Sequence, residues 1–185
     1  MIERKRRWIY RHLAQWRDLN AARVAREYVN GEGFLYLGRS YRLKLVEDQA
    51  VPLLLKDGYF CLRSDYGDAP HADAAFRAFY RQKGVQRIGE RVRAYQTKLG
   101  VQPNTVRVLE LKYRWASCRA QGRLNFHWKC RMAPLTVLDY IIVHELTHML
   151  HRNHTAAFWN AVDKALPDYR ERKAWLRVNG AGMEL

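Results

Sequence analysis

Five consecutive residues constrain the fold and chemistry of this chain more than any other feature: His144, Glu145, Leu146, Thr147 and His148. In an α-helix, side chains four positions apart lie on one face, so both imidazoles can reach a single metal ion. The glutamate then lies beside the open coordination position, where a general base would act. The pattern therefore predicts a helix that carries the zinc site of a hydrolase.

The third zinc ligand is predicted to be His154. His151 also falls on the ligand face of a continuous helix, but a rise of ~1.5 Å per residue puts its backbone ~10 Å along the axis from His144. Zn–N bonds of ~2.0–2.1 Å cannot gather three side chains spread that far. We therefore expect the helix to end and the chain to turn at Arg152-Asn153, where the asparagine adopts the left-handed conformation. The alternative is that His151 is the third ligand. If it is not, its side chain lies beside the metal or faces the solvent.

Three histidines and one glutamate indicate amide hydrolysis. Neutral imidazoles leave the charge of Zn²⁺ intact, so the ion can lower the pKa of a bound water toward ~7 and polarise a carbonyl group. Glu145 would accept the proton of the water and pass it to the departing amine. Tyr169, Arg114 and His127 are candidates to stabilise the oxyanion, and each of them is also explained by a structural role.

An alternative is an amphipathic helix whose histidines are buried without a metal. Apolar helical faces seldom carry two histidines and a glutamate within one turn, which disfavours it.

Several further motifs match one protein family in order and spacing. They are Arg114-Trp115-Ala116-Ser117-Cys118, Leu124-Asn125-Phe126, Ala133-Pro134, Asp139-Tyr140, Asn153-His154-Thr155-Ala156-Ala157-Phe158-Trp159 and Pro167-Asp168-Tyr169. On these residues, positions 113–180 resemble the YgjP-like metallopeptidases, relatives of the SprT-type and WLM-type zinc proteases. The resemblance extends upstream through residues 31–34 and 36–39 to most of the chain.

The resemblance implies a zincin-like α+β fold, in which a small antiparallel or mixed sheet packs on the active-site helix. It also implies a zinc-dependent peptidase with His144, His148 and His154 as metal ligands. Family members usually have W-G-S-C where this chain has Ala116 in place of the glycine, a departure that bears on a tight turn or a close substrate approach. Members often carry a further N-terminal β segment, so we expect this chain to be short at that end.

Apolar periodicity independently predicts an α+β order of elements. The expected elements are a helix over 4–28 closing near Asn30-Gly31, a β meander over 34–62 with turns at Gly38 and Asp57-Gly58, a helix over 72–99 with a break at Gly84, strands over 106–111, 113–117 and 123–128, and helices over 135–151, 156–166 and 168–178. The buried face of the second helix is expected to comprise Phe76, Phe79, Tyr80, Ile88 and Val92.

The strand beside the active-site helix of a zincin-like fold can pair with an extended peptide, and residues 123–128 are the candidate for that edge. The helix itself should turn its histidines toward a cleft, because its apolar residues face the core. These apolar residues are Leu138, Ile142, Leu146 and Met149.

Composition favours one intracellular enzyme domain over residues 1–185, since 48% of the residues are hydrophobic and no long linker is present. The charged start, residues 1–7, has no apolar stretch after it, and no run approaches the ~18–20 apolar residues of a membrane span. We therefore expect a cytoplasmic protein that enters no membrane. Cys61, Cys118 and Cys130 form no C-x-x-C pair, which suits reduced thiols.

The formal charge of +15 raises the question of a nucleic-acid partner besides a peptide or protein substrate. Basic residues gather in residues 3–26 and 77–98, where a DNA or RNA backbone could lie, although no base-reading motif accompanies them. The alternatives are thus a DNA-recruited protease like the SprT-type relatives, or a nucleic-acid-binding protein with a structural zinc site. Structural sites ordinarily have four protein ligands, so three histidines disfavour the last.

Overall fold

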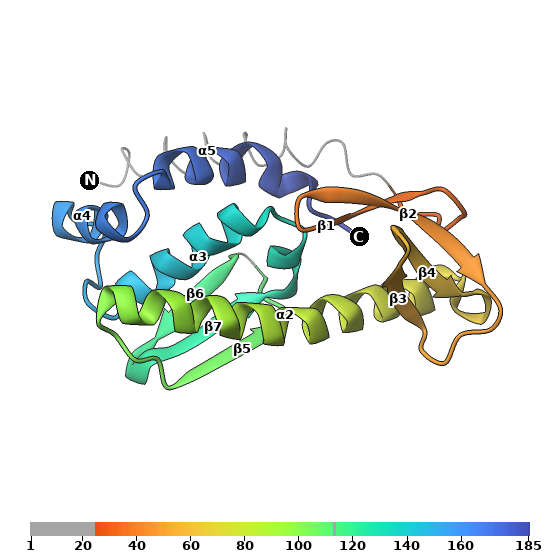
Figure 1. Cartoon of the computed structure of the whole chain (residues 1–185), viewed down its shortest axis with the longest axis horizontal. Coiled ribbons are helices and arrows are strands. Elements are labelled where there is room, and N and C mark those ends of the chain that lie inside the picture. The colour runs from red at the N-terminus through yellow and green to blue at the C-terminus, as the bar shows by residue number, and fades with distance from the viewer. Residues whose placement is uncertain (1–24, 113) are drawn as a thin grey trace, which may run out of the picture.

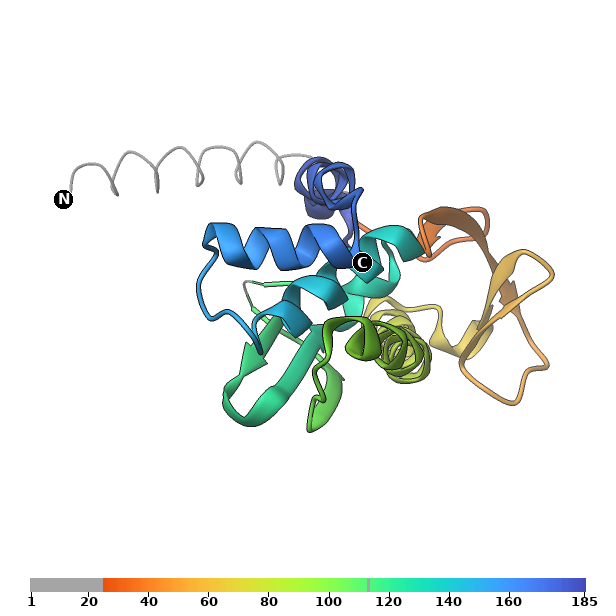
Figure 2. The same cartoon turned by 60° about the vertical axis from the view of Figure 1, so that its left-hand side comes forward.

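The computed structural model describes residues 25–112 and 114–185 of the chain, with elements labelled as in Figure 1. Two small β-sheets lie toward opposite ends of the molecule, and the long helix α2 (Ala69–Leu99) runs past both of them (Figures 1 and 2). The predicted α+β class is therefore confirmed. Among the described residues, no helix is both long and apolar enough to cross a membrane.

The helix expected over residues 4–28 lies largely outside the described residues. Its predicted last turn is wrong, because residues 25–29 are irregular and Tyr28 has a φ of 55°. The Tyr28 ring packs on Phe34 and Phe76, with ring centroids 5.6 and 5.9 Å apart, and this burial overrides the helical preference of the segment.

The first sheet contains β1 (Gly33–Tyr36), β2 (Arg39–Val46), β3 (Leu53–Lys56) and β4 (Tyr59–Arg63). The strand order is β1-β2-β4-β3, and β2 runs parallel to β4. The predicted meander is therefore wrong, although its strands and both of its turns are present. The alternation of apolar and polar side chains along the sequence identifies the strands. Which strands pair with one another depends on the core that they share.

The turn between β1 and β2 docks this sheet onto the segment that precedes the histidine helix. The backbone N–H groups of Leu37 and Gly38 donate to the carbonyls of Arg131 and Met132, at 2.8 and 2.9 Å. Gly38 has a φ of 77°, and a Cβ there would lie 2.6 Å from Pro134 Cγ. A side chain at this position would therefore push the two parts of the molecule apart.

The second sheet contains β5 (Thr105–Leu109), β6 (Ala116–Arg119) and β7 (Arg123–His127), in the order β5-β7-β6. β7 pairs with a strand on each side, parallel to β5 and antiparallel to β6. The prediction that residues 123–128 form the substrate-facing edge is therefore wrong. β6 is instead an edge strand of this sheet, joined to β7 by the tight turn over residues 120–122.

Helix α2 joins the two hydrophobic cores. It begins where the Asp68 carboxylate accepts a hydrogen bond from the His71 N–H, and it ends at Gly100 with a φ of 65°. All five residues of its predicted face are buried. The helix is not interrupted at Gly84; a Cβ there would lie 3.1 Å from Val108, so the glycine lets β5 pack closely.

The last three helices are α3 (Leu135–Thr147), α4 (Ala156–Ala165) and α5 (Tyr169–Asn179). α3 lies between the second sheet and the other two (Figure 1). Its predicted core residues Leu138, Ile142 and Leu146 are fully buried, whereas Met149 is half-buried.

A buried carboxylate ties α3 to its neighbours. Asp139 accepts two hydrogen bonds from the Arg91 guanidinium, at 2.7 and 2.6 Å, and one from the Tyr95 hydroxyl, at 3.1 Å. Arg172 of α5 lies 3.9 Å from the same carboxylate. This network holds the histidine helix against both α2 and α5.

Candidate metal centre and substrate cleft

The three predicted ligand residues converge. Nε2 of His144 lies 3.2 Å from Nε2 of His148 and 3.1 Å from Nε2 of His154. Within the part of the chain that the structure describes, these histidines form the one group suited to hold a metal ion. The edges of a tetrahedron with Zn–N bonds of ~2.0–2.1 Å measure ~3.3–3.4 Å, so the spacing fits an ion of this size.

The helix ends before the third histidine, as predicted, but at a different place. α3 stops at Thr147, and short-range hydrogen bonds from the N–H groups of Met149 and Leu150 to the carbonyls of Leu146 and Thr147 close it, both at 3.0 Å. Asn153 does not have a positive φ, so the predicted left-handed turn there is wrong. Tight bonds of this kind satisfy the last carbonyls without a left-handed residue.

His151 contacts the histidine cluster through its backbone carbonyl group and not through its imidazole ring. Its carbonyl oxygen lies 3.2 Å from Nδ1 of His148, and because a carbonyl can only accept, Nδ1 carries the proton. The lone pair of His148 then lies on Nε2, which points to the other two imidazoles. Metal-binding histidines commonly have such a carbonyl partner, which sets the ring's orientation.

The surroundings of the His144 and His154 rings favour the neutral imidazole, which is the form that binds metals. Burial, and after it the neighbouring His148 and His154, lower the pKa of His144 to about 3. The pKa of His154 is also lowered, chiefly by burial and then by His148. Buried Nδ1 of His144 has no hydrogen-bond partner among the described residues.

Aromatic rings hold the three histidines in place. The centroid of Phe158 lies 5.0, 4.7 and 4.7 Å from the rings of His144, His148 and His154. Trp159 stacks on His154 at 5.6 Å, and Tyr169 stacks on Trp159 at 5.4 Å. The sequence contained these aromatic residues, but not the information that they pack around the three histidines.

Glu145 lies one position along the helix from the first histidine and is 7% exposed. Burial raises the pKa of its carboxyl to about 7, while the backbone of Cys118 and the charge of Arg114 act in the opposite direction. A divalent cation nearby would lower this pKa and favour the carboxylate.

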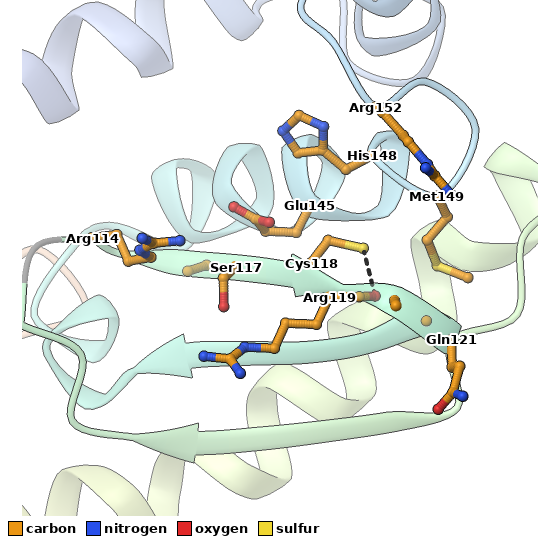
Figure 3. A pocket seen from close by; sticks show the side chains of 12 residues that line it. Arg114, Ser117, Cys118, Arg119, Gln121, Glu145, His148, Met149 and Arg152 are labelled. Atoms are coloured by element: carbon orange, nitrogen blue, oxygen red, sulfur yellow. Dashed lines mark hydrogen bonds between the residues drawn. The ribbon is translucent and has the colours of Figure 1, made fainter.

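A cleft of about 590 Å³ opens between β6 and the C-terminal end of α3 (Figure 3). It is lined by Arg114, Ala116, Ser117, Cys118, Arg119, Ala120, Gln121, Gly122, Glu145, His148, Met149 and Arg152. No described strand pairs with the outer edge of β6. Its backbone is therefore available to an extended chain that enters the cleft.

The three oxyanion candidates occupy different places. Arg114 lines the cleft beside Glu145. His127 is buried behind the sheet, where its Nδ1 accepts a hydrogen bond from Lys129 N–H at 3.0 Å, and Tyr169 packs on Trp159. Arg114 is thus the one of the three that lines the cleft.

Ala116 stands where the family usually has glycine. It is 8% exposed, lies in β6, and has no positive φ. The backbone at this position therefore needs no glycine, and the departure leaves the strand regular.

Fold and site together define a metallopeptidase: a helix with the H-E-x-x-H pattern packs on a small mixed sheet, beside an open cleft and a third histidine. A family model described as YgjP-like, metallopeptidase domain, matches residues 1–179, and the chain belongs to this family. The resemblance of its motifs and the predicted zincin-like fold are thereby confirmed.

Two other comparisons add less. A search of curated proteins finds no match to the sequence. Among solved structures, the crystal structure of the metallopeptidase zymogen of Pyrococcus abyssi abylysin is similar over 47% of this chain and 89% of that chain, with 24% sequence identity and a TM-score of 0.44. This likeness is partial, and the family assignment rests on the family model.

Proposed function

We propose that the protein is a zinc-dependent peptidase that hydrolyses peptide bonds in the cleft between β6 and α3. The observation that carries the proposal is the convergence of three imidazoles on their Nε2 atoms, beside a buried glutamate that faces the same cleft. Nitrogen donors at this spacing suit Zn²⁺, and three of them leave a position open for a reactant.

His144, His148 and His154 would hold the ion. When bound, zinc would activate a water molecule and polarise the scissile carbonyl group. A structural site would be closed by a fourth protein ligand, and among the described residues the group able to hold a metal contains only the three histidines. The arrangement therefore supports catalysis over a purely structural role.

Glu145 would act as the general base. Its carboxylate oxygen accepts the proton of the attacking water, and the same oxygen then delivers that proton to the departing amine nitrogen. Surrounding side chains exclude bulk water from the carboxyl, which keeps the proton on this path.

The outer edge of β6 would align the substrate. An extended peptide can add to this edge through main-chain hydrogen bonds, which places its carbonyl groups along the cleft. Arg114, beside Glu145, is positioned to stabilise negative charge that develops on the scissile carbonyl oxygen.

Recruitment to DNA or RNA has weaker support than peptide hydrolysis. Four arginines of the basic segment over 77–98 are already paired with acidic side chains, and these pairs neutralise much of its charge. The pairs are Arg77 with Asp73 and Glu110, Arg81 with Glu110, Arg87 with Glu90, and Arg91 with Asp139. The other basic segment, residues 3–26, lies almost entirely outside the described residues.

The experiment that tests the proposal separates catalysis from metal binding at one residue. Glu145→Gln should retain zinc and folding, because the side chain does not coordinate the ion, but should lose ~10²–10⁴-fold in the rate of peptide hydrolysis. We would measure zinc stoichiometry and the rate of hydrolysis of a peptide library on the same samples. Glu47→Gln, on an exposed loop between β2 and β3, is the matched control and should match the wild type.

Two results would overturn the assignment. Hydrolysis by Glu145→Gln at the wild-type rate would show that another group moves the proton. Loss of zinc from this variant, with retention in Glu47→Gln, would show that the glutamate belongs to the ligand set.

A further inference from the structure

Three arginines from three different segments line the cleft. Arg114 precedes β6, Arg119 is the last residue of β6, and Arg152 lies in the turn that follows α3. Figure 3 places Arg114 at one end of the cleft beside Glu145 and Arg152 at the other end beside Met149, and it shows the Arg119 side chain running from the end of β6 back across the neighbouring strand. Positive charge therefore lies at both ends of the cleft and beside β6.

This charge is not neutralised within the described part of the chain. None of the three guanidinium groups has an ion pair or a side-chain hydrogen bond there, and all three residues are exposed. The contrast with Arg91 is direct, since that guanidinium donates twice to Asp139 at 2.7 and 2.6 Å. Glu145 is the one acidic residue that lines the cleft.

An excess of positive charge in a cleft affects which substrates bind there. The protein interior around a cleft has a low dielectric constant, so the field of the arginines is focused into the cleft and attracts anionic groups. A guanidinium also binds a carboxylate through two parallel hydrogen bonds, so acidic side chains gain both charge and geometry. Lysine or arginine in the same substrate positions would be repelled.

We propose that Arg114, Arg119 and Arg152 make the cleft selective for peptides with aspartate or glutamate close to the scissile bond. This inference rests on the proposed peptidase function and names its substrate class. A peptide fits better than a nucleic acid, because the free edge of β6 offers main-chain pairing beside the arginines and a buried carboxylate lies at the floor of the cleft.

Binding to an inactive enzyme tests the selectivity without turnover. We would load Glu145→Gln with zinc and measure, by fluorescence anisotropy, its affinity for a pool of short peptides with two Asp or Glu residues. A matched pool would carry Asn and Gln at the same positions. We expect the acidic pool to bind on the order of 10-fold more tightly at low salt, with a difference that shrinks as salt rises.

Replacing the three arginines tests whether they cause the preference for acidic peptides. In the Glu145→Gln background, the triple change R114Q, R119Q and R152Q should bring the acidic pool to the affinity of the amide pool. The change R107Q is the matched control, since Arg107 is an exposed arginine of β5 that does not line the cleft. Zinc content and the melting temperature report that each variant is folded.

The outcomes separate this inference from the proposed function. Equal binding of the two pools, or a preference that survives the triple change, overturns the inference even if the wild type hydrolyses peptides. An oligonucleotide that displaces the acidic peptide in an arginine-dependent manner, and binds more tightly than it, also overturns it. If the acidic pool binds through the arginines but the wild type cleaves no peptide, selectivity stands and the peptidase proposal fails.

Discussion

The two walls of the cleft differ in burial and in the kind of group they present. The α3 wall carries the buried Glu145 and also His148, whose ring packs against Phe158. The β6 wall carries a free strand edge and exposed polar side chains such as Arg119. Groups that hold a metal need fixed orientations, whereas groups that meet a variable substrate need accessibility.

The arginines near the two walls differ in the same way: those behind α3 are paired, and those at the β6 wall are exposed. Behind α3, Arg91 and Arg172 approach the buried Asp139 and hold the helix in place. At the β6 wall, Arg114 and Arg119 have no such partner among the described residues. Changes on the α3 wall should therefore alter zinc binding and turnover strongly, and changes on the β6 wall should alter substrate binding more mildly.

The largest effect is expected at the third ligand. His154→Ala should bind zinc more than ~100-fold more weakly, because even changes to groups around a ligand cost ~10–100-fold in metal affinity. His151→Ala should keep its zinc, since the carbonyl that accepts from His148 Nδ1 remains in the variant. Elemental analysis of both purified variants measures this, and equal loss from the two would contradict the ligand assignment.

A smaller effect is expected where aromatic packing supports that ligand. Trp159→Ala removes the ring that stacks on His154 at 5.6 Å, so zinc affinity should fall by ~10–100-fold while the chain stays folded. Trp159→Phe retains an aromatic ring and should recover part of the affinity. Competition with a chelator measures the affinity directly; unchanged affinity in Trp159→Ala would mean that Phe158 alone positions the ligand.

The smallest effect is expected on the β6 wall itself. Ala116→Gly restores the residue usual in the family, but the strand is already regular at this position. The free energy of unfolding should fall by only ~0.5–1 kcal/mol, the cost of extra backbone entropy, and zinc content should not change. Urea unfolding measures this, and a stabilised variant would indicate that Ala116 strains the wall.

The sequence alone determined the features that repeat along one element. The spacing of His144 and His148 identified one helical face, and the apolar spacing in α2 identified all five of its predicted buried residues. The structure also brings His154 beside these two histidines, as expected because zinc–nitrogen bonds are too short for a straight helix to supply a third ligand; its role as a ligand stays a prediction. These inferences succeed because helix geometry is set by neighbours within a few positions.

Only the tertiary structure decided which elements meet. The pairing of β2 with β4 and the edge position of β6 depend on contacts between segments far apart in sequence, as does the gathering of Arg114 and Arg152 at one cleft. The end of α3 at Thr147 follows from the turn that brings His154 back to the other two histidines. Such choices are made by burial and close packing of distant surfaces, which periodicity along the chain does not encode.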